Sequence, residues 1–86
     1  MRILLADDHP LFREGVKPVL EKLDARVRLV EAQDYPSAFA AMHRYGDFEL
    51  VLLDLYMPGM EGVEGVARFR AAFPDTPVIV LSAAED

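Results

Sequence analysis

The stretch RILLADD, residues 2–8, sets the pattern of this chain, because an uninterrupted apolar run ends there in two adjacent carboxylates. The pattern returns in LVLLD, residues 50–54, and a third apolar run, VIVL, occupies residues 78–81. Strands that helices cover on both faces are continuously apolar in this way. We therefore expect 2–6, 50–53 and 78–81 to be interior strands of a parallel sheet.

Between these runs lie segments whose apolar residues recur with helical spacing. One helix is predicted to begin at Pro10, a second to span 35–45 between a capping Asp34 and Gly46, and a third to span 63–73. The first helix is expected to bury Phe12, Val16, Val19, Leu20 and Leu23. Residues 26–30 alternate charged and apolar side chains, which is typical of an edge strand. The alternation of strands and helices predicts an α/β protein with an open parallel sheet.

The composition is that of one soluble globular domain: 86 residues, 52% hydrophobic and 28% charged. No apolar run approaches the roughly 20 residues that a membrane-spanning helix needs. The net charge of −6 argues against nucleic-acid binding by this segment, since such affinity comes largely from Lys and Arg. The absence of cysteine fits a reducing compartment, so we expect a cytoplasmic protein.

Carboxylates and a hydroxyl follow the predicted strands: Asp7, Asp8, Asp54 and Ser82. Ligands of open parallel sheets bind beyond the carboxyl ends of the strands, where these side chains meet. Three converging carboxylates repel one another unless a cation binds, and Mg²⁺, which takes few carboxylates and completes its shell with phosphate oxygens, fits best. The alternative is that each Asp caps a turn or a helix.

Three segments carry a family resemblance: LADDHP at 5–10, DLYMPGMEG at 54–62 and VIVLSA at 78–83. In order and spacing they resemble the signatures of bacterial response-regulator receiver domains. The resemblance implies a flavodoxin-like fold, with helices on both faces of an open parallel sheet of strand order 2-1-3-4. It also implies two-component phosphorelay signalling rather than enzymatic turnover.

The resemblance assigns roles residue by residue. Asp54 matches the phosphoacceptor, with a phosphohistidine on a sensor histidine kinase as the donor. Asp8 and Asp54 match Mg²⁺ ligands, Asp7 orients the metal's water shell, and the backbone carbonyl of Tyr56 completes the site. Ser82 matches the hydroxyl that contacts the phosphoryl group and reports its presence.

The segment from Asp8 to Val16 resembles the NarL/LuxR-like subfamily, in which a DNA-binding output domain controls transcription. We expect residues 1–86 to be the N-terminal portion of a receiver domain, incomplete after the fourth strand, with neither the family's later lysine nor the output domain. A truncated, non-signalling remnant or a dimerisation module is the alternative. The uncovered edge of 78–81 predicts a homodimer through that strand.

Other interpretations give structural roles or an enzymatic function. A phosphatase of the haloacid-dehalogenase type would need a second Asp two residues after Asp54, where Tyr56 stands. His9, beside the acidic pair, is interpreted as a structural residue rather than a metal ligand or proton carrier, because Mg²⁺ prefers oxygen and a histidine is usually partly buried. Met57 and Met60 are expected to fill gaps in the core.

Overall fold

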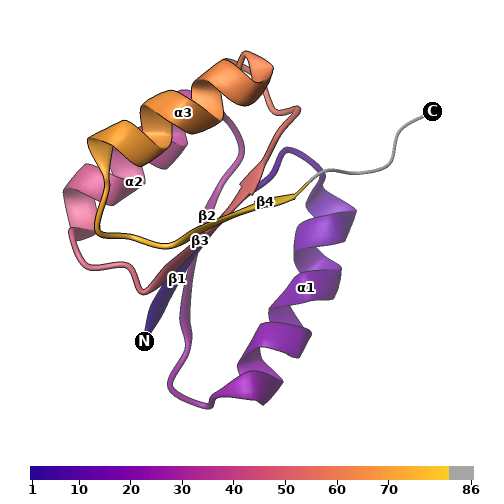
Figure 1. Ribbon diagram of the computed structural model, residues 1–86. Helices are drawn as coiled ribbons and strands as arrows, with labels where there is room; N and C mark the ends of the chain where they lie inside the picture. The colour runs from indigo at the N-terminus through magenta and orange to yellow at the C-terminus, as the bar shows by residue number, and fades with distance from the viewer. Residues whose placement is uncertain (82–86) are drawn as a thin grey trace.

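The computed structural model describes residues 1–81, in which strands and helices alternate along the chain (Figure 1). The elements are β1 (Arg2–Ala6), α1 (Pro10–Leu23), β2 (Arg28–Ala32), α2 (Tyr35–Tyr45), β3 (Leu50–Asp54), α3 (Gly62–Ala72) and β4 (Val78–Leu81). The strands form one parallel sheet in the order β2-β1-β3-β4. The flavodoxin-like fold and the strand order predicted from the sequence are confirmed.

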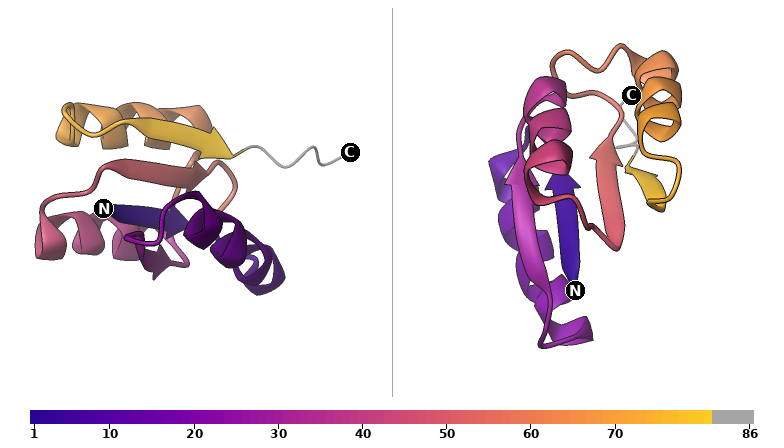
Figure 2. Two further views of the ribbon diagram at one scale, coloured as in Figure 1. Left: turned by 90° about the horizontal axis from the view of Figure 1, so that it is seen from below. Right: turned by 90° about the vertical axis from the view of Figure 1, so that its left-hand side faces the viewer.

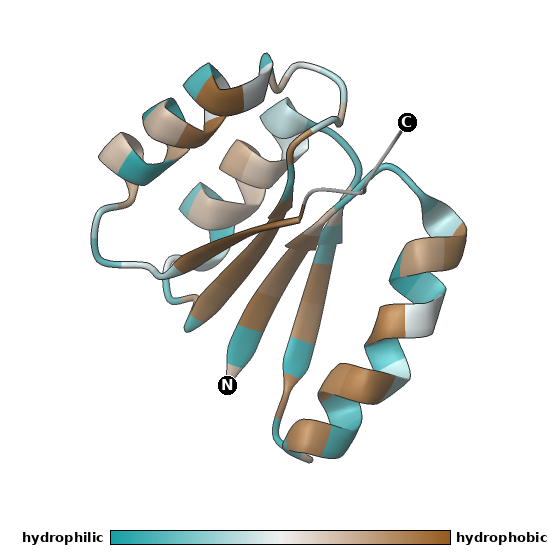
Figure 3. Ribbon diagram, turned by 45° about the vertical axis from the view of Figure 1, so that its right-hand side comes forward, coloured by the Kyte–Doolittle hydropathy of each residue, from teal (hydrophilic) through white to brown (hydrophobic). Residues whose placement is uncertain are grey.

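The sheet separates two unequal layers. Helices α2 and α3 lie on one face and α1 lies on the other (Figures 1 and 2). Alternate side chains of each inner strand point to opposite faces, so Leu4 belongs to the core under α2 and α3, whereas Ile3 and Leu5 belong to the core under α1. The middle of the sheet is hydrophobic on its whole width in Figure 3, as both-face burial requires.

The core under α2 and α3 is built around aromatic rings. Phe69 of α3 is completely buried, and its ring centroid lies 5.3 Å from that of Phe39 in an edge-to-face arrangement. Phe39 also contacts Tyr35 and Phe73, with centroids 5.0 and 5.2 Å away. Such pairs contribute beyond the apolar area that they bury. They fix α2 against α3 and both helices against β1 and β3.

Helix α2 begins and ends where the sequence predicts. The carboxylate of Asp34 accepts the backbone N–H of Ser37 at 2.8 Å, and the Ser37 hydroxyl lies 3.3 Å from the Asp34 backbone N–H, which it accepts. This reciprocal capping satisfies two donors that the first turn leaves unpaired. At the other end Gly46 has φ of 82°, a left-handed conformation that costs a glycine little, and its N–H donates to the Met42 carbonyl.

The segment after β3 is held over the sheet by close backbone contacts. The Tyr35 N–H donates to the Pro58 carbonyl at 2.9 Å, which ties the segment to α2. A Cβ added to Gly65 would overlap the Met60 carbonyl oxygen, so only glycine allows this approach of α3. Met57 and Met60 are 3% and 1% exposed, which confirms that they fill the core beneath the segment.

The prediction for the edge strand is wrong by two residues. The structure places β2 at Arg28–Ala32 instead of 26–30, although it does lie at the edge of the sheet. The Asp24 carboxylate accepts the Arg26 N–H at 2.8 Å, and the Asp24 carbonyl accepts the Val27 N–H at 3.0 Å. These bonds close a turn, so pairing with β1 begins only at Arg28.

Helix α1 buries less than its pattern predicts. Of the five apolar residues expected on its inner face only Leu20 is buried, Val16 packs partly, and Phe12, Val19 and Leu23 are 43%, 58% and 76% exposed. In residues 1–81 no second helix lies beside α1 to cover its flank. No helix in this part of the chain is long and apolar enough to cross a bilayer.

Helix α3 is shifted by one residue from the predicted 63–73, and Val63, which was expected to face inward, is 74% exposed. Residues two apart on a helix point roughly 200° away from each other. Because Gly65 faces the Met60 backbone, Val63 turns toward solvent.

We predict that Phe69→Ala lowers the free energy of unfolding by about 3–5 kcal/mol, as expected for an emptied aromatic site in a core. Val63→Ala, in the same helix but on its outer face, should change it by less than about 0.5 kcal/mol. Urea denaturation followed by circular dichroism measures both values. Equal losses in the two variants would contradict the assigned orientation of α3.

Candidate functional site

Parallel pairing brings the strand-end carboxylates together. Ala6 of β1 lies opposite Leu53 of β3, and the next residue in each chain segment is an aspartate, Asp7 or Asp54. One carboxylate oxygen each from Asp7, Asp8 and Asp54 and a ring nitrogen of His9 all lie within 4.8 Å of one another. The convergence predicted from the sequence is therefore present, and we call these four residues the acidic pocket.

Asp54 is the most enclosed member of the acidic pocket, with 2% of its surface exposed. Its Oδ1 accepts the backbone N–H of Tyr56 at 3.1 Å, whereas Oδ2 has no hydrogen-bond partner among the described residues. Burial raises the pKa of Asp54, and the charges of Asp7 and Asp8 act in the same direction against the Tyr56 hydrogen bond. One carboxylate oxygen is thus buried, uncompensated and directed into the pocket.

Asp7 and Asp8 differ in their surroundings. Asp7 is 4% exposed, and its Oδ1 accepts both the backbone N–H of His9 at 2.7 Å and a hydrogen bond from the His9 ring at 2.8 Å. The Asp8 side chain is one-third exposed, and its buried Oδ1 has no hydrogen-bond partner in residues 1–81. Asp7 therefore fixes the loop after β1, while Asp8 presents a free acceptor.

His9 lies in the pocket rather than beside it. Its Nδ1 is 2.8 Å from Asp7 Oδ1, 3.1 Å from Asp8 Oδ1 and 3.7 Å from Asp54 Oδ2, and the ring is 55% exposed. The hydrogen bond to Asp7, followed by the charges of the neighbouring carboxylates, raises the pKa of His9. The expectation that His9 is partly buried is wrong, because the ring is exposed, and its structural role stays a prediction.

The donor set fits a hard divalent cation. Two carboxylate oxygens, Asp8 Oδ1 and Asp54 Oδ2, are buried without hydrogen-bond partners among the described residues. Buried acceptors in native proteins are almost always satisfied by a protein group, a water or an ion. A divalent cation with oxygen ligands would satisfy both oxygens and remove the repulsion between the three carboxylates.

The two remaining residues expected at the site are only partly placed. Tyr56 directs its backbone N–H to Asp54, and its side chain, 58% exposed, takes no part in the pocket. Ser82 lies outside the described residues. The role expected for the Tyr56 carbonyl and that expected for the Ser82 hydroxyl both stay predictions.

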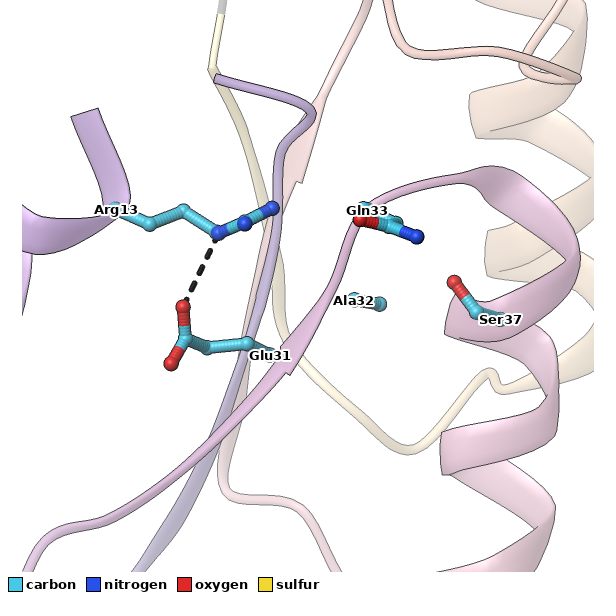
Figure 4. Close-up of a pocket in the computed structure, with 5 residues that line it drawn as sticks. All are labelled: Arg13, Glu31, Ala32, Gln33 and Ser37. Atoms are coloured by element: carbon cyan, nitrogen blue, oxygen red, sulfur yellow. Dashed lines mark ion pairs between the residues drawn. The ribbon is translucent and has the colours of Figure 1, made fainter. Parts of the chain in front are cut away.

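Arg13 connects the acidic pocket with a second hollow at the end of β2. Its guanidinium donates to the Asp7 carbonyl at 2.5 Å, and its Nε lies 3.1 Å from Glu31 Oε1 (Figure 4). Arg13 and Glu31 line a cavity of about 240 Å³ together with Ala32, Gln33 and Ser37. Sequence reasoning did not single out Arg13, which anchors the loop after β1 to α1 and β2.

Residues 3–86 match the family model described as the response regulator receiver domain. The chain belongs to the response regulator receiver domain family. This receiver domain is 41% identical over 85 residues to the glycerol metabolism activator of Pseudomonas putida, covering 99% of this chain and 38% of that protein. Regulators named DegU, NarP and NarL also match, which confirms the resemblance to the NarL/LuxR-like subfamily.

Solved structures agree with the fold of this receiver domain. Response regulator protein TrrA from Thermotoga maritima, in complex with Mg(2+)-BeF, has a TM-score of 0.82 and 32% identity, over 98% of this chain and 70% of that one. RcsB from Salmonella enterica serovar Typhimurium, bound to promoter rprA in the presence of phosphomimetic BeF3-, has a TM-score of 0.84 and 29% identity, over 95% of this chain and 42% of that one. The chain spans well under half the length of the curated relatives that it matches.

We predict that Asp54→Asn stabilises this receiver domain in metal-free buffer at neutral pH. A carboxyl group with a raised pKa in the fold destabilises it once the pH rises through the ordinary carboxyl range, and this cost is absent at lower pH. Each 1 kcal/mol relieved should raise the Tm by roughly 4–8 °C in a domain of this size. Differential scanning calorimetry between pH 4 and 8 measures the gain, which should shrink toward pH 4.

The matched control is Asp75→Asn, which removes the same charge from an exposed position. It should leave the Tm nearly unchanged at every pH. A lower Tm for Asp54→Asn than for the parent at pH 8 would show that the Asp54 charge is compensated inside the fold.

Proposed function

We propose that this receiver domain accepts a phosphoryl group on Asp54, in a Mg²⁺-dependent reaction, from a phosphohistidine of a sensor histidine kinase. The observation that carries the proposal is the uncompensated, buried Oδ2 of Asp54 in the acidic pocket. A carboxylate that only stabilised the fold would have both oxygens satisfied. Membership of a signalling family supports the same role.

The two oxygens of Asp54 have different tasks in this proposal. The Tyr56 N–H holds Oδ1 and so fixes the rotation of the carboxylate, which leaves Oδ2 to attack phosphorus. An O–P bond forms as the P–N bond to the donor imidazole breaks, and the electron pair of that bond stays on the nitrogen, which takes a proton. Catalysis of such a transfer comes mainly from positioning of the nucleophile together with electrostatic stabilisation.

Asp7, Asp8, Asp54 and the backbone carbonyl of Tyr56 would hold Mg²⁺. When bound, the ion neutralises charge on the transferring phosphoryl oxygens and on the carboxylates. The free Oδ1 of Asp8 supports direct contact for this residue, whereas Oδ2 of Asp54 is left for the attack on phosphorus. Asp7, whose Oδ1 is already engaged by His9, is better placed to orient bound water. The complex of TrrA with Mg(2+)-BeF supports the choice of metal.

The proposal about signalling downstream of the acidic pocket is supported by the similar proteins. Ser82 would contact the phosphoryl group and report its presence. RcsB was solved on promoter DNA, and we propose that residues 1–86 are the receiver portion of a cytoplasmic regulator whose output domain controls transcription. With a net charge of −6 this segment does not itself bind DNA. It is a phosphoacceptor rather than a turnover enzyme.

We predict that acetyl phosphate with Mg²⁺ adds one phosphoryl group to the parent chain and none to Asp54→Asn, because the nucleophile is lost. Intact-mass spectrometry measures the added phosphate. Chelation of Mg²⁺ should reduce the yield at least tenfold, since the charge of the carboxylates then repels the donor.

Asp75→Asn is the control and should be labelled like the parent. Equal labelling of the parent and Asp54→Asn would place the phosphate elsewhere and contradict the assignment of Asp54. No labelling of a folded parent would favour the alternative of a non-signalling remnant.

We also propose that two copies associate through β4. In residues 1–81 the strand pairs with β3 along one edge, and no strand pairs with its other edge. Its side chains are apolar and Ile79 is 51% exposed. An open apolar edge of this kind recruits another strand, and a two-fold contact satisfies both copies.

Light scattering over a dilution series measures this association. Ile79→Lys should shift the molar mass from dimer toward monomer, because a charge then faces the partner strand. Ile79 is a better position than Val80, which packs against the core and would report loss of folding instead. Val63→Lys, exposed on α3, is the control. A parent chain that stays monomeric at all concentrations would contradict the dimer.

A further inference from the structure

We propose that Nδ1 of His9 is an additional metal ligand of the acidic pocket, so that this receiver domain binds imidazole-preferring cations such as Zn²⁺ more tightly than Mg²⁺. The inference rests on the proposed function in one respect, since it concerns the same pocket. It adds a nitrogen donor to a site otherwise made of oxygens.

The donor atoms of the pocket are close enough to converge on one ion, since all four lie within 4.8 Å of one another. Nδ1 lies 2.8, 3.1 and 3.7 Å from oxygens of Asp7, Asp8 and Asp54. Ligand atoms about 2.1 Å from one cation are separated by roughly 3.0–3.4 Å. The contact with Asp8 falls in this range, whereas Asp7 is nearer, at hydrogen-bond distance, and Asp54 is farther, so the side chains must adjust to surround one ion.

A second observation is that one buried oxygen of Asp54 lacks a hydrogen-bond partner among the described residues. Asp54 has only 2% of its surface exposed. Its Oδ2 is directed into the pocket without a hydrogen-bond partner among the described residues. The His9 Nδ1 lies 3.7 Å from this oxygen, which is too distant for a hydrogen bond. An ion held by His9, Asp8 and Asp54 would fill this need.

The backbone sets the His9 ring in place before any metal arrives. Its N–H donates to Asp7 Oδ1 at 2.7 Å, the same oxygen that the ring contacts, and Pro10 begins α1 directly afterwards. His9 precedes α1 without capping it through its side chain, so the ring is not needed for the helix. A metal on Nδ1 replaces the proton that this nitrogen shares with Asp7, whereas the backbone hydrogen bond is kept, so the loop is already ordered before binding.

The donor set determines which cation binds more tightly when a histidine nitrogen is added to the site. Mg²⁺ prefers oxygen and keeps much of its water, so it uses the carboxylates alone. Imidazole suits Zn²⁺, whose affinity for nitrogen ligands also exceeds that of most earlier divalent ions. Nitrogen ligation therefore separates the two metals, and loss of His9 should affect only one of them.

The experiment compares the parent chain with His9→Ala in calorimetric titrations with Zn²⁺ and, separately, Mg²⁺. His9→Ala should weaken Zn²⁺ binding at least tenfold and Mg²⁺ binding less than twofold. The chain has two histidines, so His43→Ala on α2 is a matched control that should change neither. Circular dichroism verifies that each variant is folded.

Nitrogen NMR of the imidazole rings gives an independent readout. Zn²⁺ should shift the Nδ1 resonance of one histidine, and that signal should be missing in His9→Ala and retained in His43→Ala. A Zn²⁺ shift at His43, or equal Zn²⁺ affinity of the parent and His9→Ala, would overturn the ligand role and leave the Mg²⁺ site intact. Parallel loss of both metals in His9→Ala would also overturn it, because His9 would then only position carboxylates. No binding of either metal by the parent would defeat the proposed function as well.

Discussion

Like charges that meet at the carboxyl edge of a parallel sheet are the constraint on which this structure depends. The register of β1 and β3 sets Ala6 opposite Leu53, so the aspartates that follow are forced together. A sheet slipped by one residue would exchange the two faces of every strand and bury the wrong side chains. The strand register that packs the hydrophobic core therefore also holds the strand-end aspartates close together. Their repulsion cannot be relieved by a shift in register without disrupting the core.

The surrounding segments keep that arrangement from opening. Asp7 is bonded to the N–H of His9 within its own loop, and Arg13 holds the Asp7 carbonyl from α1. After β3, the contact between Tyr35 and Pro58 and the close approach of Gly65 fix the segment that carries the Tyr56 N–H. Rigid loops on both sides preorganise the acidic pocket for a cation and a phosphoryl group.

The two faces of the sheet contribute unequally to this rigidity. Under α2 and α3 the aromatic residues Tyr35, Phe39, Phe69 and Phe73 form a continuous packed cluster. Under α1, within residues 1–81, the buried apolar residues are only Ile3, Leu5, Leu20 and Leu52. The face with α2 and α3 thus supplies most of the hydrophobic stabilisation, while the α1 face leaves apolar side chains in solvent.

The sequence by itself determined the fold class, the strand order through its family motifs, the bounds of α2 and the identity of the converging aspartates. These features follow from local chemistry: continuous apolar runs, a capping Asp34 and a left-handed Gly46. Only the tertiary structure decided the start of β2, the outward orientation of Val63, the exposure of α1 and the entry of His9 into the acidic pocket. Periodicity records which residues share a face but not what covers that face. The position of the His9 ring depends on carboxylates at the ends of two strands, Asp7 and Asp54, which are 47 residues apart in the sequence.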